Sequence, residues 1–187
     1  MTPGRPPLLL TAAALALVAG CATLPYATDH PLGSYALASR SGALQYYVPR
    51  GWFDATLDPQ NMDNAIWLIR DDYGATITVG EVVLDSTATR MVARSGLRML
   101  ATLTMHLNAG GEAPVPTKQP ALFSMNGNEY CDYEIVLNPS QEEIRVVLFD
   151  AGGKYFEAKA LAAGNGKHAS PQEVFTAQQS FLSGLQW

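Results

Sequence analysis

The chain has 187 residues, of which 48% are hydrophobic and 16% are charged, and its formal net charge at pH 7 is −5. This length suits one ordinary domain with a core of sufficient size. The mildly acidic charge argues against a nucleic-acid-binding protein, for which a basic patch is expected.

The first feature along the chain is an apolar segment near its beginning. Leu8–Gly20 contains 13 residues, all apolar or small apart from Thr11, and Arg5 precedes it. A membrane-spanning helix needs about 20 apolar residues, so the segment is too short to span a bilayer. It has the length and the basic flank of a signal-peptide hydrophobic region.

The segment ends in Val18-Ala19-Gly20-Cys21, which resembles the lipobox of bacterial lipoproteins. The resemblance implies that residues 1–20 are a lipoprotein signal peptide, removed before Cys21. It also implies that the Cys21 thiol carries a diacylglycerol and that the new amino terminus is acylated, with fatty acids such as palmitate. Two or three acyl chains hold a protein firmly on a membrane. The alternative is a plain secretory signal with an incidental cysteine.

The resemblance also implies a location in the cell envelope. Ala22, rather than Asp, follows Cys21. By the sorting rule of enteric lipoproteins, this implies the outer membrane, with the protein on the periplasmic side. Removing 20 residues from 187 leaves 167, and removing Arg5 changes the net charge from −5 to −6.

If Cys21 is lipidated, Cys131 has no thiol partner in an oxidising compartment. Residues 130–137, "YCDYEIVL", alternate in a way typical of a strand. On such a strand Cys131 shares a face with Ile135 and Leu137, away from the carboxylates. The pattern predicts a buried, inert thiol.

The rest of the chain divides into predicted elements. Residues 21–40 are interpreted as the lipidated cysteine and a tether, because Pro25, Pro31 and Gly33 interrupt a stretch with little periodicity. Residues 41–187 are interpreted as one globular domain. Within it the sequence predicts strands at 43–49, 65–70, 75–84, 128–137, 142–151 and 154–162, with a turn at 50–51. It also predicts a long helix at 87–108, a proline-rich connector at 112–120 and a closing helix from 171.

The two helices have recognisable ends. Ser86 or Thr87 is the candidate N-cap of the long helix, and Asn108 with the following Ala-Gly-Gly is its stop signal. Ser170 and Glu173 form a candidate capping box around Pro171. Strands grouped in runs, rather than alternating with helices, predict an α+β fold in which helices pack on an antiparallel sheet.

Four stretches resemble the PsbP-like family: "YYVPRGW", "WLIRDDYGATITVGEV", "KYFEAKALA" and "FTAQQSFLSGLQW". The fold of this family is shared by PsbP and a small Ran-binding protein. The resemblance covers residues 43–187 and implies an α/β/α sandwich. It also implies an accessory or binding protein rather than an enzyme. No position here matches a metal or partner site of the family.

The sequence offers no recognisable catalytic or metal motif. It lacks G-x-S-x-G, and the nearest serine, Ser95, falls within the predicted helix. His30, His106 and His168 do not have the spacing of an H-E-x-x-H zinc site. The acidic loop at 58–63 lacks the glycine and the distal glutamate of an EF-hand. We therefore expect a protein without enzymatic activity and without a cofactor.

One surface feature of the predicted long helix is unusual. Arg90, Arg94 and Arg98 are four residues apart, which would align them on one side of a continuous helix, and residues 87–108 contain no acid. The three arginines either lie in solvent on the outer face of the helix or bind a partner. That partner is either an acidic protein or the anionic lipid headgroups.

The sequence thus predicts a lipid-anchored, periplasm-facing accessory protein that binds another protein. The alternative function is a periplasmic binding module for a small ligand or a metal, with a cleft between sheet and helix.

Overall fold

The computed structural model describes residues 23–61, 63–110, 113–137, 140–162 and 169–187. Its strands are β1 (Leu32–Ala38), β2 (Gln45–Pro49), β3 (Trp52–Asp54), β4 (Ile66–Arg70), β5 (Ala75–Glu81), β6 (Val115–Met125), β7 (Asn128–Leu137), β8 (Glu142–Ala151) and β9 (Lys154–Ala162). Its helices are α1 (Ser86–Ser95), α2 (Leu97–Asn108) and α3 (Pro171–Ser183). None of the helices in this part of the chain has the length and apolar character needed to cross a bilayer.

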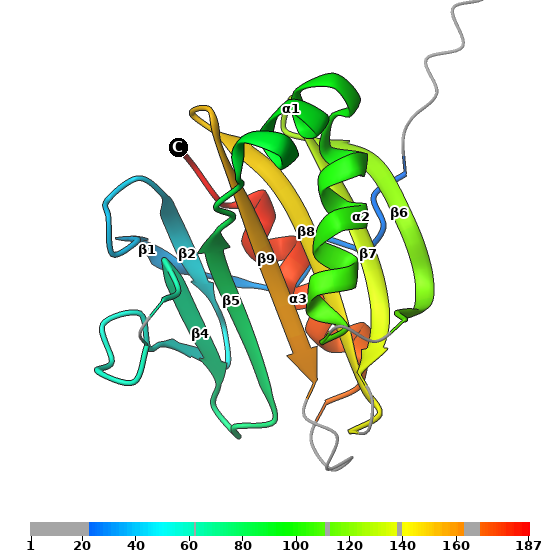
Figure 1. Ribbon diagram of the computed structural model, residues 1–187. Helices are drawn as coiled ribbons and strands as arrows, with labels where there is room; N and C mark the ends of the chain where they lie inside the picture. Colours follow the sequence, from blue (N-terminus) through cyan, green and yellow to red (C-terminus); the bar gives the residue numbers. More distant parts are fainter. Residues whose placement is uncertain (1–22, 62, 111–112, 138–139, 163–168) are drawn as a thin grey trace, which may run out of the picture.

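Antiparallel strands form the centre of the molecule (Figure 1). The main sheet has the order β3-β4-β5-β9-β8-β7-β6, and β1 pairs with β2 in a separate two-stranded sheet. Strands β7, β8 and β9 follow one another in the chain and in the sheet, which is the predicted meander. The α+β class predicted from the sequence is therefore confirmed.

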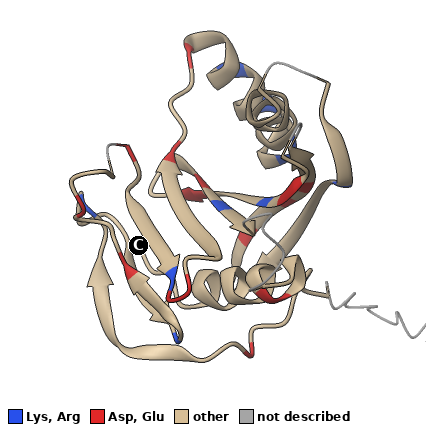
Figure 2. Ribbon diagram, turned by 90° about the horizontal axis from the view of Figure 1, so that it is seen from below, with Lys and Arg blue, Asp and Glu red and all other residues tan. Residues whose placement is uncertain are grey.

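Helices cover both faces of the sheet (Figures 1 and 2). On one face, α1 and α2 pack on side chains such as Tyr133, Val146 and Leu148. On the other face, α3 packs on side chains such as Val147 and Phe149. Alternate residues of β8 thus enter two different cores, because successive side chains of a strand point to opposite faces. The layers form the predicted α/β/α sandwich.

The long predicted helix is two helices. Gly96 separates α1 from α2 with φ 70° and ψ −167°, a conformation that residues with a Cβ rarely adopt. The N-cap of α1 is also not one of the predicted residues. Asp85 caps it, and its carboxylate accepts hydrogen bonds from the backbone N–H groups of Thr87 and Ala88 at 2.8 and 2.7 Å. The capping box of α3 is present as predicted, at Ser170 and Glu173.

Three strands lie where no strand was predicted, and one of them is the short β3, which follows the predicted turn at 50–51. β1 occupies residues 32–38, within the stretch interpreted as a tether. β6 includes most of the proline-rich stretch 112–120. Pro116 and Pro120 fit there because β6 is an edge strand and its register against β7 shifts near both prolines. Proline, which has no N–H to donate, is tolerated at edges and bulges.

Candidate functional site

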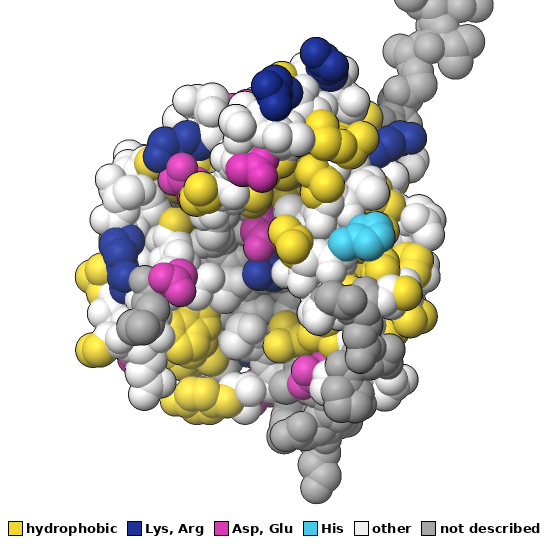
Figure 3. Space-filling view, in the orientation of Figure 1, with side chains coloured by type: hydrophobic (Ala, Val, Ile, Leu, Met, Phe, Trp, Pro, Cys, Tyr) yellow, Lys and Arg dark blue, Asp and Glu magenta, His cyan; other side chains and the backbone are white. Residues whose placement is uncertain are grey.

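An apolar cavity of about 670 Å³ lies on the α1–α2 side of the sheet. Its walls come from the connection between β5 and α1, from the first turn of α1 and from α2. Val82, Val83, Leu84, Leu100, Leu103 and Leu107 supply most of the apolar lining. Figure 3 looks onto this face, where hydrophobic side chains gather over α2 and the surface is hollowed beside it.

Two residues leave large apolar surfaces at the edge of the cavity. Val83 is 88% exposed and Leu107 is 76% exposed. Asp85, Thr102 and His106 add polar groups to the lining. An apolar cavity with a few polar groups is the usual form of a ligand-binding or side-chain-binding site.

A polar network adjoins the cavity through Thr104, which also lines it. The Tyr133 hydroxyl donates to Thr104 Oγ1 at 3.3 Å and accepts from Asn108 Nδ2 at 2.8 Å. Asn108 Nδ2 also donates to Glu157 Oε2, which belongs to β9. Lys159 Nζ lies 2.9 Å from Glu157 Oε1. These bonds fix the end of α2 on the sheet, so that this wall of the cavity is held in place.

A second cluster lies on the opposite face of the sheet, between the sheet and α3. Arg145 and Asp132 are fully buried there. Arg145 Nε donates to Asp132 Oδ2 at 3.0 Å, and Lys118 Nζ donates to the same oxygen at 2.7 Å. Arg145 also donates to the side-chain oxygens of Gln178 and Gln179 in α3. Burial lowers the pKa of Arg145, and the charge of Asp132 opposes this change.

The chain segment 23–31, here called the strap, closes this cluster. The Arg145 guanidinium lies over the Tyr26 ring, with Cζ 4.7 Å from the ring centroid. The Tyr26 ring also meets the Phe175 ring edge-on. The Tyr26 hydroxyl donates to Glu134 Oε1 at 2.8 Å. Cation–π and charge-assisted contacts of this kind are strongest when they are desolvated.

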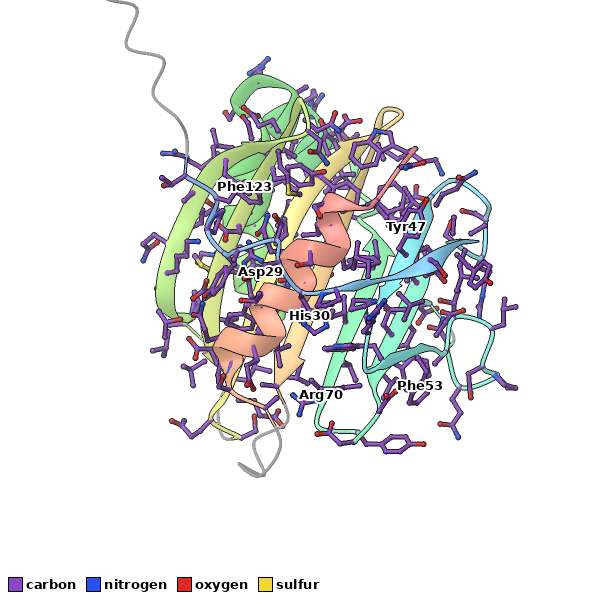
Figure 4. The ribbon with its side chains drawn as sticks, turned by 180° about the vertical axis from the view of Figure 1, so that it is seen from behind. Asp29, His30, Tyr47, Phe53, Arg70 and Phe123 are labelled. Atoms are coloured by element: carbon purple, nitrogen blue, oxygen red, sulfur yellow. The ribbon has the colours of Figure 1, made fainter. Side chains whose placement is uncertain are left out.

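The far end of the strap is also attached. His30 N donates to Ser180 Oγ of α3 at 3.1 Å, and His30 Nε2 donates to the Arg50 carbonyl at 2.9 Å. Figure 4 shows His30 and Asp29 beside α3, on the side of the molecule opposite the cavity. The strap is therefore packed on the domain from Tyr26 onward, and the predicted free tether is wrong for these residues.

The predicted thiol environment of Cys131 is confirmed. The residue is free of a disulfide and fully buried, on the face shared with Ile135. Burial, followed by the charge of Asp132, raises the pKa of the thiol to about 12. The thiolate is the reactive form of cysteine, so this side chain is chemically inert in the folded protein.

The predicted arginine stripe is interrupted. Arg90 and Arg94 belong to α1 and Arg98 belongs to α2, so the break at Gly96 places them on two helices rather than on one side of one helix. All three remain exposed.

The two described histidines, His30 and His106, lie on different sides of the sheet. His106 lies on the exposed side of α2, where Nδ1 donates to the Thr102 carbonyl at 2.9 Å, whereas His30 lies on the α3 side. His168 and Cys21 lie outside the described residues. Across the described ranges, no three His, Cys, Asp or Glu side chains are grouped so that they could hold a metal ion.

The acidic loop at 58–63 is organised by protein groups. Asn61 is 2% exposed, and its Nδ2 donates to the Thr56 carbonyl at 2.8 Å. Arg40 donates to the carbonyls of Thr56 and Asn61. Asp58 Oδ1 accepts from the backbone N–H of Gln60. The guanidinium of Arg40 thus occupies two carbonyl oxygens at this loop.

Sequence reasoning missed both the cavity and the cluster under the strap. One signal for the cluster was present: Arg145 stands within the otherwise apolar run "IRVVLF" of β8. A charged residue at such a position is buried only with a partner. Nothing in the local pattern identified Tyr26 or the cavity walls, which come from segments that are distant in sequence.

Comparisons with known proteins show a likeness in structure only. No protein-family model matches the chain. No curated protein sequence matches it either.

The solved structures that resemble the domain include the following two. Cyanobacterial PsbP (CyanoP) from Synechocystis sp. PCC 6803 matches with a TM-score of 0.51 and 12% identity, over 81% of this chain and 91% of that one. The Ran-binding protein Mog1p of Saccharomyces cerevisiae matches with a TM-score of 0.50 and 11% identity, over 83% of this chain and 96% of that one. At this identity the likeness concerns the fold, and the chain contains a domain with a PsbP-like fold.

Proposed function

We propose that the protein is a lipid-anchored accessory protein, attached to the outer membrane through Cys21 and facing the periplasm, that binds a protein partner. The cavity between the β5–α1 connection and α2 is the proposed binding site. The proposal assigns no catalytic activity to the domain. The proposed anchor is supported by the lipobox-like Val18-Ala19-Gly20-Cys21 and by the short apolar run before it.

The observation that carries the binding role is the exposed apolar surface at the cavity. Val83 and Leu107 are exposed to solvent beside the apolar cavity. Leu100, which lies in α2 like Leu107, is by contrast fully buried. Fully burying one such side chain contributes about 1.5–3 kcal/mol. A partner that inserts an apolar side chain between them gains this energy, which is the pattern of an interface anchor. The name of the yeast neighbour, a Ran-binding protein, supports a binding role for this type of fold.

The volume of the cavity favours a second candidate. About 670 Å³ lies within the range of about 300–1,000 Å³ that is typical of small-molecule sites. In this second candidate function, a periplasmic module binds a small apolar ligand in the same cavity. For the metal-binding form of this alternative, the described part of the chain contains no candidate ligand group.

Site-specific cross-linking in cells tests the proposal. A photoreactive residue at Leu107 should capture one partner protein, whereas the same residue at Leu57, which is 79% exposed and outside the cavity, should not. The change Leu107→Asp should weaken the recovered complex, while Leu57→Asp leaves it unchanged. Capture at both positions, or at neither, would contradict the protein-binding role. An organic molecule that stays bound in native mass spectrometry of the purified protein would support the second candidate instead.

The same cells test the anchor. Cys21→Ser should release the protein from the membrane fraction, because the sulfur that carries the acyl chains is gone. Mass spectrometry of the wild-type mature protein should find a lipidated amino-terminal cysteine. An unmodified amino terminus at another residue would overturn the lipoprotein assignment.

A further inference from the structure

The strap limits how far the folded domain lies from the proposed lipid. This inference rests on the proposed acylation of Cys21. The described chain begins at Thr23, and Tyr26 is already packed on Arg145 and Phe175. Two peptide units separate Cys21 from Thr23, so their Cα atoms are at most about 8 Å apart. The domain is therefore held next to the bilayer surface rather than on a long tether.

The starting point of the strap determines which part of the domain is close to the bilayer. Figures 1 and 4 both show the described chain beginning beside the edge strand β6, toward the end of the molecule that carries α1. The opposite end carries the turn between β4 and β5, with the exposed Tyr73. The beginning of the strap, at Thr23, thus lies near the corner formed by α1, the beginning of α2 and β6.

This corner carries positive charge although the whole chain is acidic. Residues 86–108 contain three arginines and no acidic residue, and Arg90, Arg94 and Arg98 are all exposed. Figure 3 shows Lys and Arg side chains gathered over α1 at this end. Three acids lie at its margins, Asp85 before α1 and Glu129 and Asp150 beside Gly96 and Leu97. The Asp85 carboxylate accepts from the backbone of α1, and Asp150 Oδ1 accepts from the Gly153 N–H. The arginines therefore dominate the charge of the helical surface.

Apolar side chains accompany the arginines at the β6 edge. Arg98 lies in the first turn of α2, and α2 contacts β6, whose Leu122 is the register partner of Cys131. Leu122 is 42% exposed and Leu24 of the strap is 36% exposed. Arginines beside exposed leucines are the composition of surfaces that rest on a bilayer interface.

We propose that this corner lies on the anchoring membrane, where Arg90, Arg94 and Arg98 contact the phosphates of anionic phospholipid headgroups. The strap and the arginines then act together: the acyl chains fix the position of the domain, and the arginines fix its orientation.

The test uses the mature lipidated protein in vesicles of phosphatidylethanolamine, with and without phosphatidylglycerol. A fluorophore is attached to Ser124→Cys on β6 or to Tyr73→Cys at the opposite end, and a quencher is placed in the lipid headgroups. Cys131 is buried, so only the introduced thiol is labelled. We expect strong quenching at position 124 and weak quenching at position 73 in anionic vesicles.

Charge reversal tests the role of the arginines. The variant R90E/R94E/R98E should remain bound to the vesicles through its acyl chains but lose the difference in quenching between positions 124 and 73. Arg94→Glu should reduce that difference, whereas Arg50→Glu, an exposed arginine outside this corner, should leave it unchanged. High salt should act like the triple variant, because it screens exposed charges.

The outcomes separate the two proposals. Equal quenching at both positions in the vesicle-bound protein, or a difference that survives charge reversal and salt, would overturn the membrane-facing corner while leaving the lipid anchor intact. A mature protein that carries no lipid would overturn the anchor and this inference together.

Discussion

At the scale of single residues, the least expected feature is the fully buried Arg145. A buried guanidinium is tolerated because Asp132 and the side chains of Gln178 and Gln179 each accept from it. The Tyr26 ring excludes water from its open side. Asp132 Oδ2 accepts hydrogen bonds from both Arg145 and Lys118. Asp132 Oδ1 has no hydrogen-bond partner among the described residues. The cluster joins the sheet, α3 and the strap, so it positions three separate parts of the chain.

Removing one partner of this cluster should be costly. Arg145→Met removes one of the two cationic partners of the buried Asp132 carboxylate, and we expect a loss of about 3–5 kcal/mol in the free energy of unfolding. Lys154→Met, which breaks the exposed pair with Glu81, is the matched control and should change stability by less than about 1 kcal/mol. Urea unfolding measures both. A small loss for Arg145→Met would show that the buried pair does not hold the strap and α3 in place.

At the scale of elements, Gly96 decides the shape of the helical layer. The helical periodicity of residues 87–108 runs through this position, but its backbone conformation ends α1 and starts α2 in a new direction. A Cβ at Gly96 would meet no atom within 4 Å. The requirement for glycine is therefore conformational rather than steric.

This difference makes a clean prediction. Gly96→Ala should destabilise the protein by about 1–3 kcal/mol, because its φ and ψ lie in a region that glycine alone populates readily. Gly80→Ala in β5 also meets no atom within 4 Å and has no positive φ, so it should change stability little. Thermal unfolding of the two variants, side by side, checks the prediction. Equal stability would mean that the α1–α2 break tolerates an ordinary residue.

At the scale of the whole molecule, many weakly acidic side chains are buried in the two cores. Burial raises the pKa of Tyr130 and of Tyr133 from the usual 10.0 to about 12. Burial likewise raises the pKa of Cys131 to about 12, from 9.0. As pH rises from about 9 toward 12, the unfolded chain therefore releases protons that the folded protein retains. Stability is lost in that window, because it falls with pH wherever the folded state binds more protons.

We accordingly expect the urea midpoint to fall as pH is raised above about 9. Each group that is ionised only in the unfolded state lowers the free energy of unfolding by about 1.4 kcal/mol per pH unit. Cys131→Ala should remove the part of the decrease that begins nearest pH 9 and leave the part due to the tyrosines. A midpoint that stays constant up to pH 11 would show that these side chains are solvated in the folded protein.

The sequence by itself determined the class of fold, the meander β7–β9 and the closing helix, because alternation, turn residues and a capping box are local signals. It also predicted the inert Cys131, since strand alternation places it away from the carboxylates. It did not predict β6, whose prolines are tolerated only because the strand lies at the sheet edge, or the break at Gly96.

Only the tertiary structure decided the rest. The strap is bound by Glu134, Arg145 and Phe175, which lie more than a hundred residues after Tyr26, so no local pattern announces that it packs on the domain. The cavity likewise joins the β5–α1 connection to α2, and its exposed Val83 and Leu107 look in the sequence like ordinary helix and strand residues. Local periodicity encodes which face of an element is apolar, whereas which segments meet, and what they leave uncovered, follows from long-range packing.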